Sequence, residues 1–134
     1  MEPVKVIIRY RNGNLLKGYT NDFFPNKPSF HVHPIESGQT EKGIEVVVAQ
    51  LKAIFFVKDF SGDSSHHDQK QFTESQQPTG RKAEVKFTDG EVLVGSTMGY
   101  DPKRPGFFMA PADPGSNNLR VYVVSTAVSS FRFL

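Results

Sequence analysis

Two stretches of the chain repeat one another, and this repeat limits the folds that the chain can adopt. The 27 residues from Ile8 to Pro34 align without gaps on Val85 to Pro111, 77 positions later, with eight identities. The identical pairs are Gly13/Gly90, Leu16/Leu93, Gly18/Gly95, Thr20/Thr97, Pro25/Pro102, Pro28/Pro105, Phe30/Phe107 and Pro34/Pro111. Glycine and proline decide where a backbone turns, so copies that share them are expected to share one fold. After loops of different length, Ala53 is expected to match Ala127, at an offset of 74.

Both copies have the pattern of short β-strands joined by tight turns. Residues 83–88 alternate apolar and polar side chains, and Asn12-Gly13 and Asp89-Gly90 are typical of type I′ hairpin turns. In the first copy we expect strands at 4–10, around Leu16 and Gly18, and at 30–32, 44–50 and 53–57. In the second copy we expect them at 83–87, around Leu93 and Gly95, and at 107–109, 120–124 and 127–133. Two-residue corners are expected at 51–52 and 125–126, and no amphipathic helix is expected.

These strands predict an all-β protein of two tandem, five-stranded small barrels that pack together as a pseudo-dimer. The copies would span residues 1–60 and 82–134. Residues 61–81 are rich in Ser, Gln, Asp and His, which predicts a flexible polar linker. A lone domain of about 55 residues is marginally stable, and this favours packing of one copy against the other. Exchange of strands between the copies remains an alternative.

The first hairpin of each copy resembles a known motif. The pattern apolar-x-apolar-x-[Asn/Asp]-Gly-x-x-Leu-x-Gly runs from Ile8 to Gly18 and again from Val85 to Gly95. It resembles the first motif of Sm-like and bacterial Hfq-type small barrels, which have SH3-like folds. Residues 51–54 resemble their second motif, in which a short 3₁₀ corner joins the last two strands. The resemblance implies an Sm-like or SH3-like barrel for each copy.

The chain departs from the Sm-like pattern at the positions that contact RNA. A proline-containing loop replaces the short connection that carries an RNA-contacting residue, and Ser125-Thr126-Ala127 lacks the basic residue that grips RNA. The resemblance therefore implies the fold and leaves RNA binding as an alternative function. Residues 53–60 and the end of the second copy also resemble an uncharacterised bacterial domain associated with signalling proteins, which implies no particular chemistry.

Composition and motifs exclude several classes of function. The absence of cysteine excludes disulfides, thiolate zinc sites and cysteine nucleophiles, and the net charge of +2 is too small for a protein that wraps DNA. The N-terminus has no signal-peptide pattern and the apolar runs are too short to span a bilayer, so we expect a cytoplasmic protein that does not enter the membrane. No nucleophile elbow, phosphate-binding glycine loop or zinc-protease motif is present. We expect neither an enzyme nor a cofactor.

The most distinctive candidate site is a loop found in both copies, [Phe/Tyr]-x-Pro-x-[Lys/Arg]-Pro-x-Phe. Its prolines stiffen the backbone around a cation that lies near an aromatic ring, an arrangement suited to a phosphate, a carboxylate or a nucleobase. The candidate ligand-binding residues are Phe23, Lys27, Phe30, Tyr100, Arg104 and Phe107. The alternative is that Pro and Phe close the end of the barrel and the cations are merely solvated. The sequence thus predicts a non-catalytic binding or regulatory module for a protein partner or a small anionic ligand, with self-association into a homo-oligomer as a further expectation.

Two other sets of residues offer competing sites. Basic residues on the hairpins could contact the phosphates of single-stranded RNA or DNA, and the candidates are Arg9, Arg11, Lys17 and Lys86. His31 and His33 share a strand face and could bind a metal with His66 and His67. The second copy has no histidines at the equivalent positions, so we expect a solvated strand face and no metal.

Overall fold

A computed structural model describes residues 3–35, 43–60, 80–112 and 116–134, and it confirms the all-β class. The strands of the first half are β1 (Val4–Tyr10), β2 (Leu15–Thr20), β3 (Ser29–Pro34), β4 (Ile44–Val47) and β5 (Leu51–Val57). Those of the second half are β6 (Arg81–Phe87), β7 (Val92–Thr97), β8 (Gly106–Pro111), β9 (Asn118–Val124) and β10 (Val128–Phe133). Two 3₁₀ turns, η1 (Val48–Gln50) and η2 (Ser125–Ala127), join the last two strands of each half.

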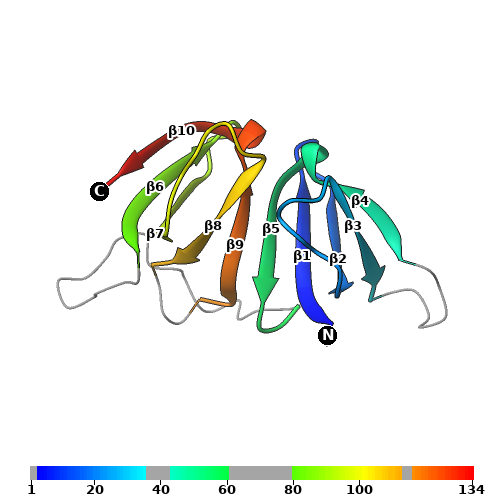
Figure 1. Cartoon of the computed structure of the whole chain (residues 1–134). Helices are drawn as coiled ribbons and strands as arrows, with labels where there is room; N and C mark the ends of the chain where they lie inside the picture. The colour runs from blue at the N-terminus through cyan, green and yellow to red at the C-terminus, as the bar shows by residue number, and fades with distance from the viewer. Residues whose placement is uncertain (1–2, 36–42, 61–79, 113–115) are drawn as a thin grey trace.

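All ten strands form one antiparallel sheet that does not close on itself. Their order is β10-β6-β7-β8-β9-β5-β1-β2-β3-β4, so β10 and β4 lie at opposite ends of the molecule (Figure 1). β5 pairs with β1 of its own half and also with β9, which is the one pairing between the halves among the described strands. The prediction of two tandem barrels is therefore not confirmed, because this shared pairing makes the halves one continuous, open sheet.

The pairings of the second half reproduce those of the first half, 77 residues later. Ile8 of β1 pairs with Ile54 of β5, and Val85 of β6 pairs with Phe131 of β10. The same offset relates the β2·β3 pairs to the β7·β8 pairs, and the β3·β4 pairs to the β8·β9 pairs. Both halves therefore have the same strand order and the same register, whatever their evolutionary origin.

The predicted offset of 74 near the end of each copy is wrong. Ala53 lies on β5, opposite Arg9, and its counterpart on β10 is Ser130, opposite Lys86. Ala127 instead ends η2. Small buried side chains serve both in a strand and in a tight corner, so matching one alanine to the other misplaced the alignment. The predicted position of the first corner, 51–52, is also wrong, because the 3₁₀ turn lies at 48–50. The second turn, at 125–127, includes the predicted residues 125–126.

Both hairpin turns contain a glycine with positive φ, 93° at Gly13 and at Gly90. The Gly13 N–H donates to the Tyr10 carbonyl at 3.0 Å, and the Tyr10 N–H donates to the Asn14 carbonyl at 3.0 Å. This is a type I turn followed by a glycine bulge, and the second turn repeats both hydrogen bonds. The predicted type I′ turn is wrong, because among the described residues only glycines have positive φ and Asn12 therefore does not.

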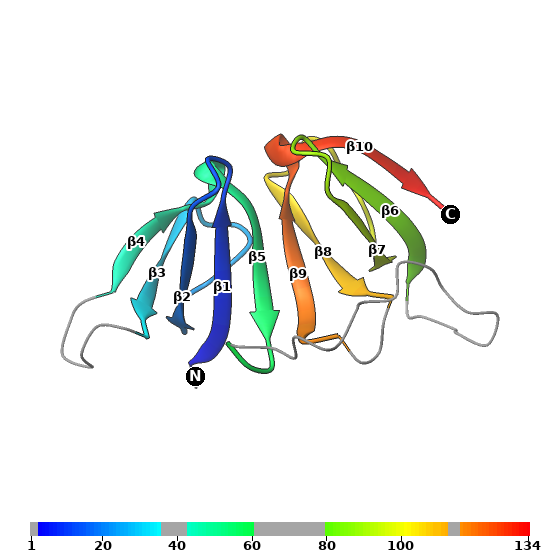
Figure 2. The ribbon, with the colours of Figure 1, turned by 180° about the vertical axis from the view of Figure 1, so that it is seen from behind.

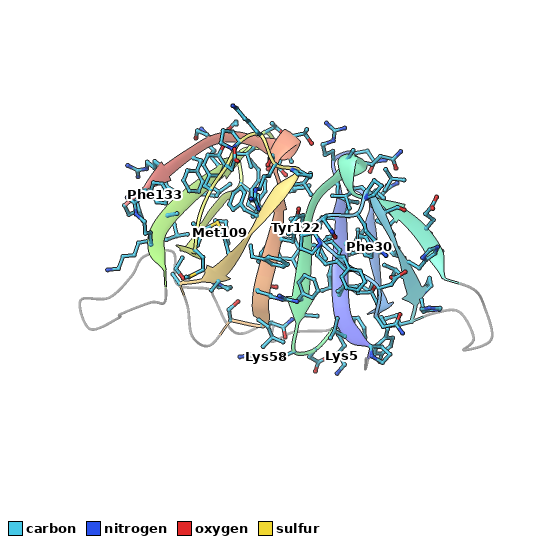
Figure 3. All side chains as sticks on the ribbon, in the orientation of Figure 1. Lys5, Phe30, Lys58, Met109, Tyr122 and Phe133 are labelled. Atoms are coloured by element: carbon cyan, nitrogen blue, oxygen red, sulfur yellow. The ribbon has the colours of Figure 1, made fainter. Side chains whose placement is uncertain are left out.

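Two apolar cores lie on opposite faces of the central strands β5 and β9. Ile54 of β5 and Tyr122 of β9 belong to the first core, whereas Ala53 and Val121 belong to the second. All four side chains are at most 2% exposed. Successive side chains of a strand point to opposite faces, so these two strands supply both cores. Figure 2 shows β5 and β9 side by side between the halves, and Figure 3 places Tyr122 there, with Phe30 in the first half.

The predicted linker falls mostly on residues 61–79, which lie outside the described residues. Its last residue, Arg81, belongs to β6, where its guanidinium lies 3.7 Å from the centroid of the Phe133 ring. The C-terminal limit of the predicted linker is therefore corrected to precede Arg81. No helix in the described part of the chain is long and apolar enough to cross a membrane.

Replacing Gly95 with alanine should destabilise the fold, because β7 and β8 approach closely there. A Cβ at Gly95 would collide with the backbone carbonyl of Ala110, which cannot move without disturbing the sheet. We expect the free energy of unfolding, measured with urea, to fall by about 1–3 kcal/mol. Gly99→Ala is the matched control, since nothing lies within 4 Å of its added Cβ. Equal losses in the two variants would contradict this explanation.

Candidate functional site

The second proline-containing loop is held rigidly at the surface. The Arg104 N–H donates to the Asp101 carbonyl at 3.0 Å, and the Lys103 N–H donates to Asp101 Oδ1 at 2.9 Å. The Ser125 N–H of η2 donates to the Pro105 carbonyl at 2.9 Å. The first loop repeats the turn and the bond to its own 3₁₀ turn. Both loops therefore fold alike and present their cations in a fixed backbone setting.

The aromatic candidates of the first loop are packing residues. Phe30 is 1% exposed in the first core. The ring of Phe23 lies edge-on, 5.0 Å from that of Phe30 and 5.1 Å from that of Tyr122, measured between centroids. It also contacts Phe108, 6.2 Å away. Because Tyr122 and Phe108 belong to the second half, Phe23 fastens the two halves together.

The aromatic candidates of the second loop combine packing with exposure. Phe107 is 6% exposed in the second core. Tyr100 is half-buried and stacks on Phe131 of β10 with 3.9 Å between the ring centroids. One face of the Tyr100 ring is therefore already covered, which fixes its orientation.

An open cavity of about 640 Å³ lies beside the second loop. It is lined by Pro25, Thr97, Met98, Gly99, Tyr100, Asp101, Arg104, Gly106, Phe107, Phe108 and Tyr122. Three of the predicted site residues, Tyr100, Arg104 and Phe107, therefore share one cavity. The first loop contributes Pro25, so both halves form the wall. A cavity of this size suits a small molecule.

The predicted cations of the two loops do not share this cavity. Arg104 Nε lies 3.9 Å from Asp101 Oδ2, too far for a hydrogen bond, and the Arg104 side chain is 78% exposed. Its guanidinium can therefore bind an incoming anion. Lys27 Nζ lies 4.9 Å from the centroid of the Phe24 ring, and Lys27 lines a separate cavity of about 330 Å³.

The cavity contains several lining residues that sequence reasoning missed. Met98, which is 79% exposed, lines the cavity. Thr97 lines it as well, and its hydroxyl donates a hydrogen bond to the Phe108 carbonyl at 2.9 Å. Tyr122 lines it from β9, where burial raises the pKa of its hydroxyl. Tyr122 and Phe108 were not predicted, because they lie outside the loop motif and line the cavity through the pairing of β8 with β9.

The basic candidates for nucleic-acid binding divide between the halves. Arg9 and Lys17 share the outer face of the β1–β2 hairpin with Lys5, since opposite residues of paired strands lie on one face. Lys5 and Lys58 lie at the same end of the molecule (Figure 3). The Lys5 ammonium donates a hydrogen bond to the backbone carbonyl of Lys58 at 3.4 Å. Arg11 lies in the hairpin turn, and Lys86 lies on β6 of the other half. The structure thus brings together two of the four predicted residues.

The histidine candidates face solvent beside a carboxylate. Asp22 accepts hydrogen bonds from the His31 backbone N–H at 2.9 Å and from Thr20 at 3.1 Å, and Asp22 Oδ2 lies 2.8 Å from His31 Nδ1. Burial raises the pKa of Asp22, but these hydrogen bonds outweigh it and hold the pKa below its usual range. No cluster of three metal-ligating residues occurs within the described ranges, and His66 and His67 lie outside them.

A buried lysine joins the halves and was also missed. Lys52 of β5 is 8% exposed, and its Nζ lies 2.7 Å from Asp89 Oδ2 and 2.6 Å from Glu91 Oε1 in the β6–β7 turn. The hydrogen bond from Lys52 holds the pKa of Asp89 below its usual range. Packing of β5 against the second half brings these residues together, and no local sequence pattern signals that packing.

Comparison with known proteins gives one match. A model described as a family of unknown function (DUF6982) matches residues 2–134, almost the whole chain. No curated protein and no solved structure matches.

Replacing Phe23 with alanine should weaken the joint between the halves. We expect the free energy of unfolding to fall by about 2–3 kcal/mol, because a large ring is lost from a site where four aromatic rings meet it. Phe24→Ala is the matched control, since Phe24 is 40% exposed, and it should cost less than about 1 kcal/mol. Urea unfolding measures both, and equal costs would show that Phe23 does not fasten the halves.

Proposed function

The chain belongs to this family of unknown function, and we propose that it is a non-catalytic binding module that holds a small anionic ligand in the cavity beside Arg104. The observation that carries the proposal is the convergence of Arg104, Tyr100 and Phe107, predicted from the sequence as binding residues, on one cavity of about 640 Å³. Binding cavities for small molecules commonly combine apolar walls with a few fixed polar groups.

The walls of the cavity indicate the chemistry of the ligand. Arg104 supplies a guanidinium that is held only loosely by Asp101, and a phosphate or carboxylate would bind it with stronger, charge-assisted hydrogen bonds. Tyr100, Phe107 and Met98 offer apolar and aromatic contacts beside it. These features favour a ligand with one anionic group attached to an apolar or flat ring system.

The finer interpretation of the fold is part of the same proposal. Each half resembles an opened Sm-like or SH3-like barrel, and the support for this is the 3₁₀ turn before the last strand and the identical register of the halves. In this interpretation the halves form a covalent pseudo-dimer, and Pro25 of the first half completes a cavity whose other lining residues belong to the second half.

Adenosine 5′-monophosphate, which joins a flat base to a phosphate, is a suitable probe for the cavity. In an amide NMR titration we expect saturable shifts of Gly99 and Gly106, which line it. Arg104→Ala should weaken binding about tenfold or more, because it removes charge-assisted hydrogen bonds. Lys103→Ala, which removes a neighbouring cation that does not line the cavity, should leave the affinity within about twofold. Equal weakening in both variants, or the absence of any shift, would contradict the proposal.

A second candidate function is the binding of single-stranded RNA or DNA by the outer face of the β1–β2 hairpin. Lys5, Arg9 and Lys17 lie together on this face, and neither strand contains an acidic residue. Tyr19 is 39% exposed on the same face, where a base could stack on its ring.

The two candidate functions respond differently to salt and to mutation. The Arg9→Ala/Lys17→Ala double variant should bind fluorescent oligo(dT) more weakly, and the slope of log affinity against log salt should fall by about 1.4, the value for two lost phosphate contacts. The Lys103→Ala/Arg104→Ala variant has the same net charge and is the control. If oligo(dT) does not bind, or if both variants lose affinity equally, the hairpin face is not a nucleic-acid site.

A further inference from the structure

Each end of the ten-stranded sheet is a strand that pairs on one side only. Among the described strands, β4 pairs with β3 alone and β10 pairs with β6 alone. Their counterparts at the offset of 77 are β9 and β5, which pair with one another in the middle of the chain. We propose that β10 of one copy pairs with β4 of a second copy, head to tail, in the way that β5 pairs with β9 within the chain.

The exposure of apolar side chains supports a second copy as the occupant of these edges. Ile44 on β4 is 47% exposed, whereas its counterpart Val121 on β9 is fully buried. Phe133 on β10 is 39% exposed, whereas its counterpart Phe56 on β5 is 4% exposed. At these two positions the edges keep apolar side chains that the central pair buries, whereas Glu45 and Arg132 replace the central Tyr122 and Phe55. An exposed apolar edge strand is a template for pairing with another chain.

The charged groups that meet at the central pair have neutral counterparts at the two edges of the sheet. In the centre, Lys52 of β5 binds the two carboxylates of the β6–β7 turn. At the equivalent positions the edges have Ser129 on β10 and Asn12 and Asn14 in the β1–β2 turn, so the cation and both anions are replaced by neutral polar groups. Pairing between copies would therefore bury no unpaired charge at this position, whereas a lysine opposite two asparagines would.

The central register predicts which residues meet. Phe55 pairs with Val121 on β5 and β9, so Arg132 of one copy is expected to lie opposite Ile44 of the next. The Leu134 N–H donates to the Lys82 carbonyl of β6, so Arg132, two residues earlier, directs its own N–H toward β6 as well. Arg132 and Ile44 then form a pair without mutual hydrogen bonds, in which the Cα atoms lie about 4.5 Å apart. That separation permits a disulfide.

Because the chain has no cysteine, a cross-link between introduced cysteines reports this contact alone. The Ile44→Cys/Arg132→Cys double variant of the full chain should form disulfide-linked dimers and larger species on mild oxidation, seen on a non-reducing gel. Either single variant should form few dimers, because head-to-tail pairing never brings identical edges together. Strong dimers from a single variant, or none from the double variant, would overturn the proposal.

Sedimentation equilibrium of the full chain provides an independent test. The wild-type protein should associate with increasing concentration, into a closed ring or an open chain of copies, either of which satisfies the proposal. Ile44→Lys should weaken association at least about tenfold, because it places a cation opposite Arg132 and removes an apolar contact. Leu15→Lys, at a position with 48% exposure on β2, is the matched control and should associate as the wild type does. A monomer at every concentration, or equal effects of the two variants, would refute head-to-tail pairing.

Discussion

The antiparallel pairing of β5 with β9 is the interaction on which the rest of the structure depends. It is the one strand pairing between the described parts of the halves, and β5 along nearly its whole length and β9 from Val121 to Val124 are buried on both faces. Each strand sends alternate side chains into each core, so neither half encloses its apolar interior alone. Small domains bury a low fraction of their surface, and sharing two strands between two cores offsets that disadvantage.

The polar contacts at the joint contribute specificity as well as stability. Lys52 is buried, and its partners Asp89 and Glu91 remain about half exposed, so the lysine bears most of the desolvation cost. A register slip of one residue would leave that lysine buried without its carboxylates and would reverse the faces of every side chain. The ion pairs and the alternating apolar side chains therefore select the same register.

Much of the fold could be predicted from local patterns, and the joint between the halves could not. Glycine and proline positions and alternating side chains predicted both hairpins and nearly every strand, because these signals are confined to neighbouring residues. The pairing of β5 with β9 joins residues more than sixty positions apart, such as Ile54 and Tyr122, and no local pattern encodes it. The candidate site divides in the same way. Arg104 and Tyr100 were predicted from their loop, whereas Phe108 and Tyr122 line the cavity through the pairing of β8 with β9, which the loop motif does not encode.

Tyr122 and Val124 of β9 complete the core of the first half, and this affects how the protein folds during its synthesis. A ribosome makes the chain from its N-terminus, so strands β1 to β5 emerge while the side chains that complete their interior are still unmade. Part of the apolar core of the first sixty residues therefore stays exposed to solvent until translation has passed residue 124. Closing the long loop between β5 and β9 costs chain entropy before the contacts between the halves form, and folds dominated by distant contacts fold slowly. During that interval the open apolar surface and the unpaired edge of β5 are the parts of the nascent chain most prone to aggregation.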